Sequence, residues 1–89
     1  MPHKIIGFSP ADNDFLSDYI SAQLAFIQTI FPDIQTELSN ENDDKLLRYC
    51  KTPDRFPCFM LLKNNIYKTH SHAKMSEKDF CLWVTSKLG

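Results

Sequence analysis

The sequence predicts an α/β fold with the element order β-α-β-α-β-β-α, in which a four-stranded mixed sheet has helices on both faces. Three observations carry this prediction. A long stretch of helical apolar spacing separates two β-type runs at residues 4–8 and 34–38, which favours parallel strands joined by a right-handed crossover. Residues 58–62 are continuously apolar, as in a central strand covered on both faces. The asparagine pair at 64–65 suits the two-residue turn of a hairpin.

The first helix is expected between the strand at residues 4–8 and Pro32. Ser9 is a candidate N-cap with Pro10 in the first helical position, and the acidic run at 12–14 offers a cap one turn later. Two apolar stripes then follow at helical spacing, so we expect a wide apolar face against the sheet. The first stripe is Leu16, Ile20, Leu24, Ile27 and Phe31, and the second is Phe15, Tyr19, Ala22, Phe26 and Ile30.

The later elements are shorter. Residues 34–38 alternate with a period of two, as a strand with one buried face does. A short helix is expected over residues 46–50, before the next proline. Residues 66–72 return as the antiparallel partner of the central strand. Ser76 opens a capping box, and the last helix has an apolar stripe made by Phe80, Trp83, Val84 and Leu88.

The composition favours one small globular domain over residues 1–89, since 43% of the residues are hydrophobic and 24% are charged. Residues 1–44 carry one basic and eight acidic side chains, whereas residues 45–89 carry nine basic and three acidic ones. The net charge of −1 gives no attraction to phosphate, so no nucleic-acid partner is expected. No apolar run approaches the roughly 18–20 residues of a membrane span, and the N-terminal residues lack a signal-peptide core. We therefore expect a cytoplasmic protein with no membrane partner.

The cysteines and histidines offer little recognisable chemistry. Cys50, Cys58 and Cys81 are odd in number and form no CxxC pair, which favours buried thiols in a reducing compartment over a disulfide framework or a zinc site. His70 and His72 stand two residues apart, so both side chains point to one face of a strand. They could ligate a metal together, but no third ligand lies nearby in the sequence, and His3 is only a distant candidate. We expect a solvated strand face there, and we assign no metal and no cofactor.

The second half of the chain resembles thioredoxin. From Arg55 to Asn65 it reads RFPCFMLLKNN, which looks like the thioredoxin segment in which a proline precedes an apolar strand and a Lys-Asn-Gly turn. The likeness continues without a gap over residues 57–88, whereas the first half resembles thioredoxins in pattern only. The resemblance implies a thioredoxin-like fold and a cis peptide bond at Pro57.

The chain departs from thioredoxins at the site of their chemistry. Thioredoxins have a CxxC motif before the long helix, but residues 8–14 contain no cysteine. Two thioredoxin glycines are also replaced, one by Asn65 in the turn and one by Ala73 before the last helix. Without the thiol pair, two-electron dithiol exchange at this site cannot occur. We therefore predict a redox-inactive thioredoxin-like domain.

The resemblance implies a role in protein interaction, or as an accessory module. In redox-active relatives an extended polypeptide lies in the groove beside the cis-proline, and we expect the groove to persist after the chemistry is lost. A protein or an extended peptide is therefore the expected partner, and self-association is left open. The residues assigned to the groove are Phe8, Ser9, Pro10, Ala11, Phe56 and Pro57, with Phe8 and Phe56 as apolar anchors.

The alternative is a monothiol redox enzyme. Cys58 would be its nucleophile, and Arg55 would supply the positive charge that lowers the pKa of a reactive thiol. Because Cys58 begins an apolar strand, we expect its side chain to pack in the core instead.

Overall fold

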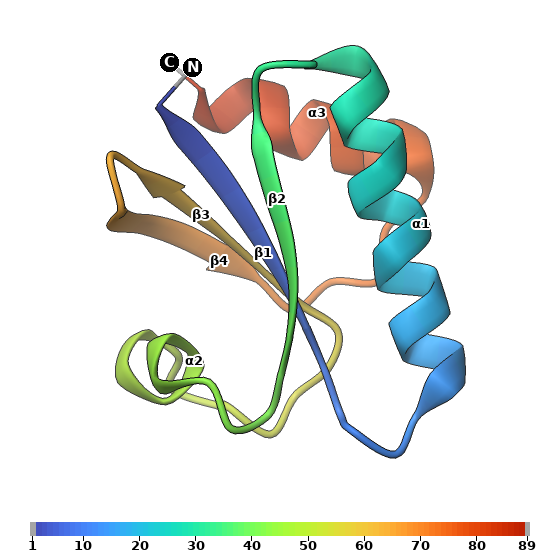
Figure 1. The fold of residues 1–89 in the computed structure, drawn as a ribbon, viewed down its shortest axis with the longest axis vertical. Helices are drawn as coiled ribbons and strands as arrows, with labels where there is room; N and C mark the ends of the chain where they lie inside the picture. Colours follow the sequence, from blue (N-terminus) through green and yellow to red (C-terminus); the bar gives the residue numbers. More distant parts are fainter. Residues whose placement is uncertain (1, 89) are drawn as a thin grey trace.

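The computed structural model describes residues 2–88 and contains the seven elements that the sequence predicts, in the predicted order (Figure 1). Among the described residues, no helix is both long enough and apolar enough to cross a membrane. The elements are β1 (His3–Ser9), α1 (Asp14–Ile30), β2 (Gln35–Asn40), α2 (Asp44–Tyr49), β3 (Cys58–Lys63), β4 (Ile66–Ser71) and α3 (Glu77–Lys87).

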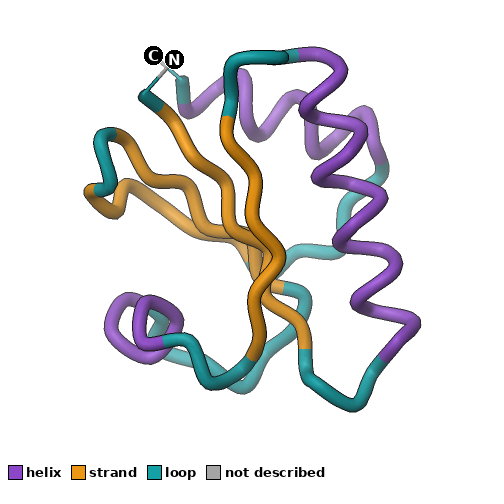
Figure 2. The backbone as a smooth tube through the Cα atoms, viewed as in Figure 1, coloured by secondary structure: helices purple, strands orange, loops and turns teal. Residues whose placement is uncertain are grey.

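The four strands form one mixed sheet in the order β2-β1-β3-β4 (Figure 2). The edge strand β2 runs parallel to β1, and β3 runs antiparallel to both β1 and β4. The β3–β4 hairpin turns at Asn64 and Asn65, whose φ angles of 53° and 64° lie in the left-handed region. A two-residue turn with positive φ at both positions matches the twist of the flanking strands, and asparagine tolerates that region. The hairpin turn is therefore where the sequence predicts it.

Helices cover both faces of the sheet, and each face has its own core. Figure 1 shows α1 and α3 on one side of the sheet and α2 on the other. Because successive side chains of a strand point to opposite faces, β3 divides its apolar residues between the two cores. One core contains Ile5, Ile20, Leu24, Ile27, Ile34, Phe59, Leu61, Phe80 and Val84. The other contains Ile6, Phe8, Leu46, Cys50, Cys58, Met60 and Leu62.

Gly7 lets α1 approach the sheet closely. A Cβ atom at this position would overlap Cγ2 of Ile20 and would lie 3.3 Å from Cδ1 of Leu24. A larger residue would therefore push the helix away from β1 or force Ile20 into another rotamer.

The face of α1 that packs on the sheet is narrower than predicted. Ile20, Leu24 and Ile27 of the first stripe are buried, but Phe15 and Ile30 of the second stripe are 72% and 46% exposed. The buried face instead includes Gln23, because its Nε2 donates to the carbonyl of Met75 at 2.7 Å. The expectation of a fully buried second stripe is thus wrong: Tyr19 packs against the core, but the ends of the stripe are exposed and Gln23 adds a polar residue to the buried face.

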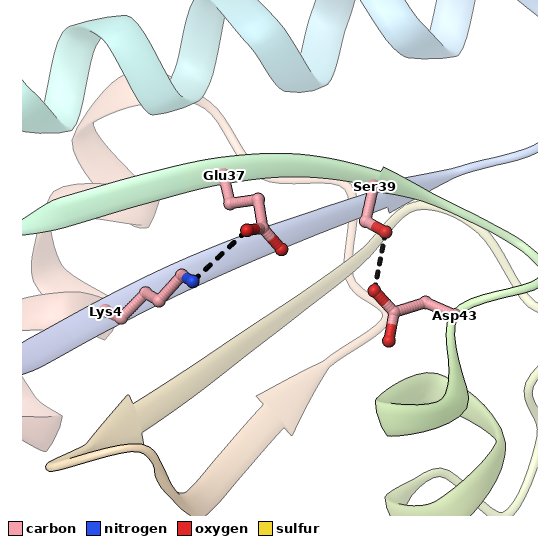
Figure 3. Close-up of polar contacts among 4 residues, drawn as sticks. All are labelled: Lys4, Glu37, Ser39 and Asp43. Carbon is pink, nitrogen blue, oxygen red and sulfur yellow. Dashed lines mark hydrogen bonds and ion pairs between the residues drawn. The ribbon is translucent and has the colours of Figure 1, made fainter.

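Each helix begins at a side-chain cap. The cap of α1 is Asn13, within the 12–14 run, and Ser9 remains in β1. Ser76 caps α3 as predicted, and Asp43 caps α2 through the backbone N–H of Lys45 at 2.8 Å. Asp43 also accepts a hydrogen bond from Ser39 at 2.6 Å, drawn as a dashed line in Figure 3, and this bond joins α2 to the end of β2.

An ion pair links the two parallel strands. Nζ of Lys4 in β1 lies 3.2 Å from Oε1 of Glu37 in β2, a contact drawn as a dashed line in Figure 3. Both side chains are partly exposed, and pairs of this kind contribute little to stability, about 0–1 kcal/mol. The β1–β2 pairing therefore depends mainly on its backbone ladder and on the core beneath it.

Candidate functional site

A groove of about 490 Å³ opens where the chain leaves β1 and where it approaches β3. Two of the predicted groove residues, Pro10 and Phe56, line it together. A second hollow of about 260 Å³ adjoins the groove at Pro10 and is lined by Ser9 and Ala11 as well. The structure thus brings the β1–α1 connection and the loop before β3 to one surface.

The remaining lining of the first groove is apolar and acidic, apart from the amide of Asn42. Leu47 on α2, which is 56% exposed, and Pro53 supply further apolar surface. Glu41 and Asp54 supply carboxylates, and no basic residue is among the residues that line the groove. Oε1 of Glu41 accepts a hydrogen bond from the backbone N–H of Ala11 at 3.2 Å, which ties the β2–α2 turn to the β1–α1 connection.

Two predicted groove residues do not face the groove. Phe8 is fully buried, because the alternation of β1 points its side chain into the core under α2. The prediction of Phe8 as an exposed anchor is therefore wrong, and the groove is lined by the exposed Leu47 instead. Pro57 is buried and does not line the groove, and the peptide bond between Phe56 and Pro57 is cis.

The thiol of Cys58 is in the core. Its side chain is fully buried, and its Sγ lies 3.7 Å from Sγ of Cys50, which is 6% exposed. Burial raises the pKa of both thiols above the ordinary value, so both are held in the protonated form. A thiolate nucleophile needs the opposite environment, with a lowered pKa and access to solvent.

Arg55 does not act on this thiol in the way the enzyme hypothesis requires. The groups that influence the pKa of Cys58 are its own burial and the neighbouring Cys50. The contact that Arg55 makes with this region is through its backbone, whose carbonyl oxygen accepts from Nδ1 of His72 at 3.0 Å.

His70 and His72 lie on the face of the sheet that packs against α2. Their rings are 5.1 Å apart, and Nδ1 of His70 lies 2.6 Å from the hydroxyl oxygen of Tyr67. Burial, and then the neighbouring His72, lower the pKa of His70. The expectation of a solvated strand face is only partly right, because both histidines are half-buried and both have hydrogen-bond partners.

His72 also meets the two cysteines. One ligand atom from each of Cys50, Cys58 and His72 lies within 4.8 Å of the others. These three residues, which we call the Cys–His cluster, come from the end of α2, the start of β3 and the segment after β4. The partners of His72 are therefore cysteines that lie across the hairpin, and not His3, the distant third ligand that the sequence suggests.

Comparison with known proteins identifies the fold. No family model matches the chain, and no curated protein matches it. Among solved structures, the chain is similar to thioredoxin from Fasciola hepatica, with a TM-score of 0.69 and 9% identity over 96% of this chain and 80% of that one. It is also similar to oxidised thioredoxin O2 from Arabidopsis thaliana, with a TM-score of 0.67 and 12% identity over 94% and 73% of the two chains.

A further similar chain comes from a study of thiol resolution in the yeast mitochondrial 1-Cys peroxiredoxin. Its TM-score is 0.69 and its identity is 12%, over 94% of this chain and 77% of that one. Identities this low show a shared fold and no more. The element order, the strand order β2-β1-β3-β4 and these similarities together show that the chain has a thioredoxin-like fold and carries no CxxC motif.

Proposed function

We propose that this thioredoxin-like domain binds an extended peptide in the groove between Pro10, Leu47 and Phe56 and performs no thiol chemistry. The observation that carries the proposal is the groove itself, whose volume of about 490 Å³ is enough for one or two side chains of a bound peptide.

The lining of the groove defines the kind of peptide. Its prolines, Leu47 and Phe56 favour an apolar side chain in the centre. Glu41 and Asp54 favour a positive charge beside it, because an acidic surface attracts a basic partner and repels an acidic one. The expected occupant is therefore an extended segment with a large apolar residue flanked by lysine or arginine.

The cysteines argue against an enzymatic role. The N-terminal end of α1, where a thioredoxin carries its CxxC motif, reads Ser-Pro-Ala-Asp-Asn over residues 9–13. Cys58 is buried, with its pKa raised by burial, and it does not line the groove. The proposed peptide-binding surface therefore has no thiol of its own, and the buried thiol of Cys58 is not accessible from it.

The test uses fluorescent peptides of one length with leucine or phenylalanine at the centre and either lysine or glutamate on both sides. We expect the lysine-flanked peptides to bind more tightly, with an affinity that falls as salt is added. The variant Leu47→Ser removes an exposed apolar side chain from the groove and is expected to weaken binding about tenfold. Leu47 is chosen because Phe56 also packs against the core under α2.

Leu82→Ser is the matched control, since Leu82 lies on α3 and is 58% exposed, compared with 56% for Leu47. Asp54→Asn tests the charge and is expected to reduce the preference for lysine without removing the apolar contact. Equal binding of the lysine-flanked and glutamate-flanked peptides, or equal loss in the two leucine variants, would show that the groove is not the binding site.

A further inference from the structure

The Cys–His cluster brings two thiols and one imidazole close together beside the loop that precedes β3. Cys50 follows the last turn of α2, and its backbone N–H donates to the carbonyl of Leu46, which fixes the start of the loop. Cys58 ends the loop as the first residue of β3 and is fully buried. His72 follows β4 and is half-buried, so the cluster is open toward solvent on the histidine side.

The pairing of β3 and β4 brings His72 to the cysteines. The last paired residues of the hairpin are Phe59 and Ser71, and continuing that register by one residue places His72, just after β4, opposite Cys58. Residues directly opposite in an antiparallel pair point to the same face, which here is the face under α2. The strand register therefore brings the imidazole of His72 close to the two thiols.

We propose that Cys50, Cys58 and His72 bind one zinc ion, with a water molecule in the fourth position. Two thiolates and an imidazole are a donor set that zinc prefers, and three protein ligands with one open position are a common arrangement for this ion. Binding releases the two thiol protons to solvent, and no electron is transferred.

The geometry of the cluster suits a tetrahedral ion. Zinc–sulfur bonds of about 2.3 Å at a tetrahedral angle hold two sulfurs about 3.8 Å apart. The two Sγ atoms are 3.7 Å apart, and a ring nitrogen of His72 lies within 4.8 Å of both. The sulfurs are much farther apart than the roughly 2.05 Å of a disulfide, so they are not bonded to each other.

The hydrogen bonds of His72 favour the same assignment. Nδ1 lies 3.0 Å from the carbonyl oxygen of Arg55, which only accepts, so Nδ1 carries the proton. Nε2 is then the atom with a free lone pair, and its remaining contact is a long one of 3.4 Å to the hydroxyl of Thr52. A histidine that ligates a metal through one nitrogen usually donates from the other to a carbonyl or carboxylate.

The test is a titration of the reduced, metal-free protein with Co²⁺ and then with Zn²⁺, in the presence of a phosphine reductant. We expect one Co²⁺ per chain with a sulfur-to-cobalt charge-transfer band, and displacement of that band by one equivalent of Zn²⁺. Cys50→Ser and His72→Gln are expected to weaken zinc binding on the order of 100-fold or more, since loss of a supporting second-shell group alone costs about 10–100-fold. Circular dichroism confirms that each variant is folded.

Cys81→Ser is the matched control, because this cysteine lies on α3, on the other face of the sheet. It is expected to bind both metals as the wild type does. No charge-transfer band in the wild type would overturn the proposal, and so would an unchanged zinc affinity in folded Cys50→Ser and His72→Gln. Formation of a Cys50–Cys58 disulfide at the same rate with and without zinc would also overturn it, because bound zinc protects both thiols.

Discussion

The contact between Gly7 and α1 gives a stability prediction that can be worked out from the structure. A methyl group at position 7 would overlap Cγ2 of Ile20 and come within 3.3 Å of Leu24. Inserting a methyl group into a packed core generally costs about 1–3 kcal/mol. Replacing glycine also restricts the unfolded chain, which stabilises the fold by about 0.4–1 kcal/mol. We therefore expect Gly7→Ala to lower the free energy of unfolding by about 1–2 kcal/mol.

Urea denaturation measures this change, and a thermal scan should show a fall in Tm of roughly 4–15 °C. A double-mutant cycle with Ile20→Ala locates the cause. That change alone removes a fully buried side chain and should cost about 2–5 kcal/mol. In the double variant the new methyl group occupies part of the space that Ile20 leaves. The double variant should therefore lose less stability than the sum of the losses in the two single variants. A Gly7→Ala protein as stable as wild type, or strict additivity in the cycle, would refute the close packing of α1 on β1.

Three further changes test other parts of the fold. Burial and the charges of Lys63 and Lys68 lower the pKa of His3 in the folded protein from its ordinary value near 6.5. As pH falls, the unfolded chain therefore takes up a proton on His3 at a higher pH than the folded protein does, and this favours unfolding. Urea unfolding from neutral pH to about pH 5 should show stability falling by up to about 1.4 kcal/mol per pH unit for this histidine, with a shallower slope in His3→Leu. Tyr19→Phe should cost about 1–3 kcal/mol in urea and speed hydrogen exchange of the Met75 amide, because the Tyr19 hydroxyl bonds both backbone groups of Met75. Asp43→Ala should cost about 1 kcal/mol in thermal unfolding by removing the α2 cap; a loss no larger than in exposed Asp18→Ala would contradict that role.

The fold could be predicted from the sequence because its signals are local. The apolar run at 58–62, the asparagine turn and the Ser76 capping box each depend on a few adjacent residues, and each element is found where predicted. The face of α1 depends on more distant residues. Gln23 is buried because it bonds Met75, which is 52 residues away, and apolar spacing cannot reveal such a partner.

The Cys–His cluster could not be predicted for a similar reason. In a regular hairpin with its turn at Asn64–Asn65, the pairs counted outward from the turn place Ser71, not His72, opposite Cys58. A register shift between Leu61 and Leu62 adds one residue to β4 and moves His72 into that position. The surface groove was partly predicted, since Pro10 and Phe56 line it. The contribution of Leu47 could not be predicted, because it lies on α2 and the sequence does not show how that helix is oriented on the sheet.

Whether this thioredoxin-like fold works without thiol chemistry is tested most directly by a disulfide-reductase assay. The reduced, metal-free wild type and its Cys58→Ser variant are assayed side by side at the same concentration. With Cys58 buried and no cysteine at the N-terminal end of α1, neither protein should reduce a disulfide substrate faster than the uncatalysed reaction. Reductase activity in the wild type that disappears in Cys58→Ser would contradict this, and it would make the protein a monothiol redox enzyme.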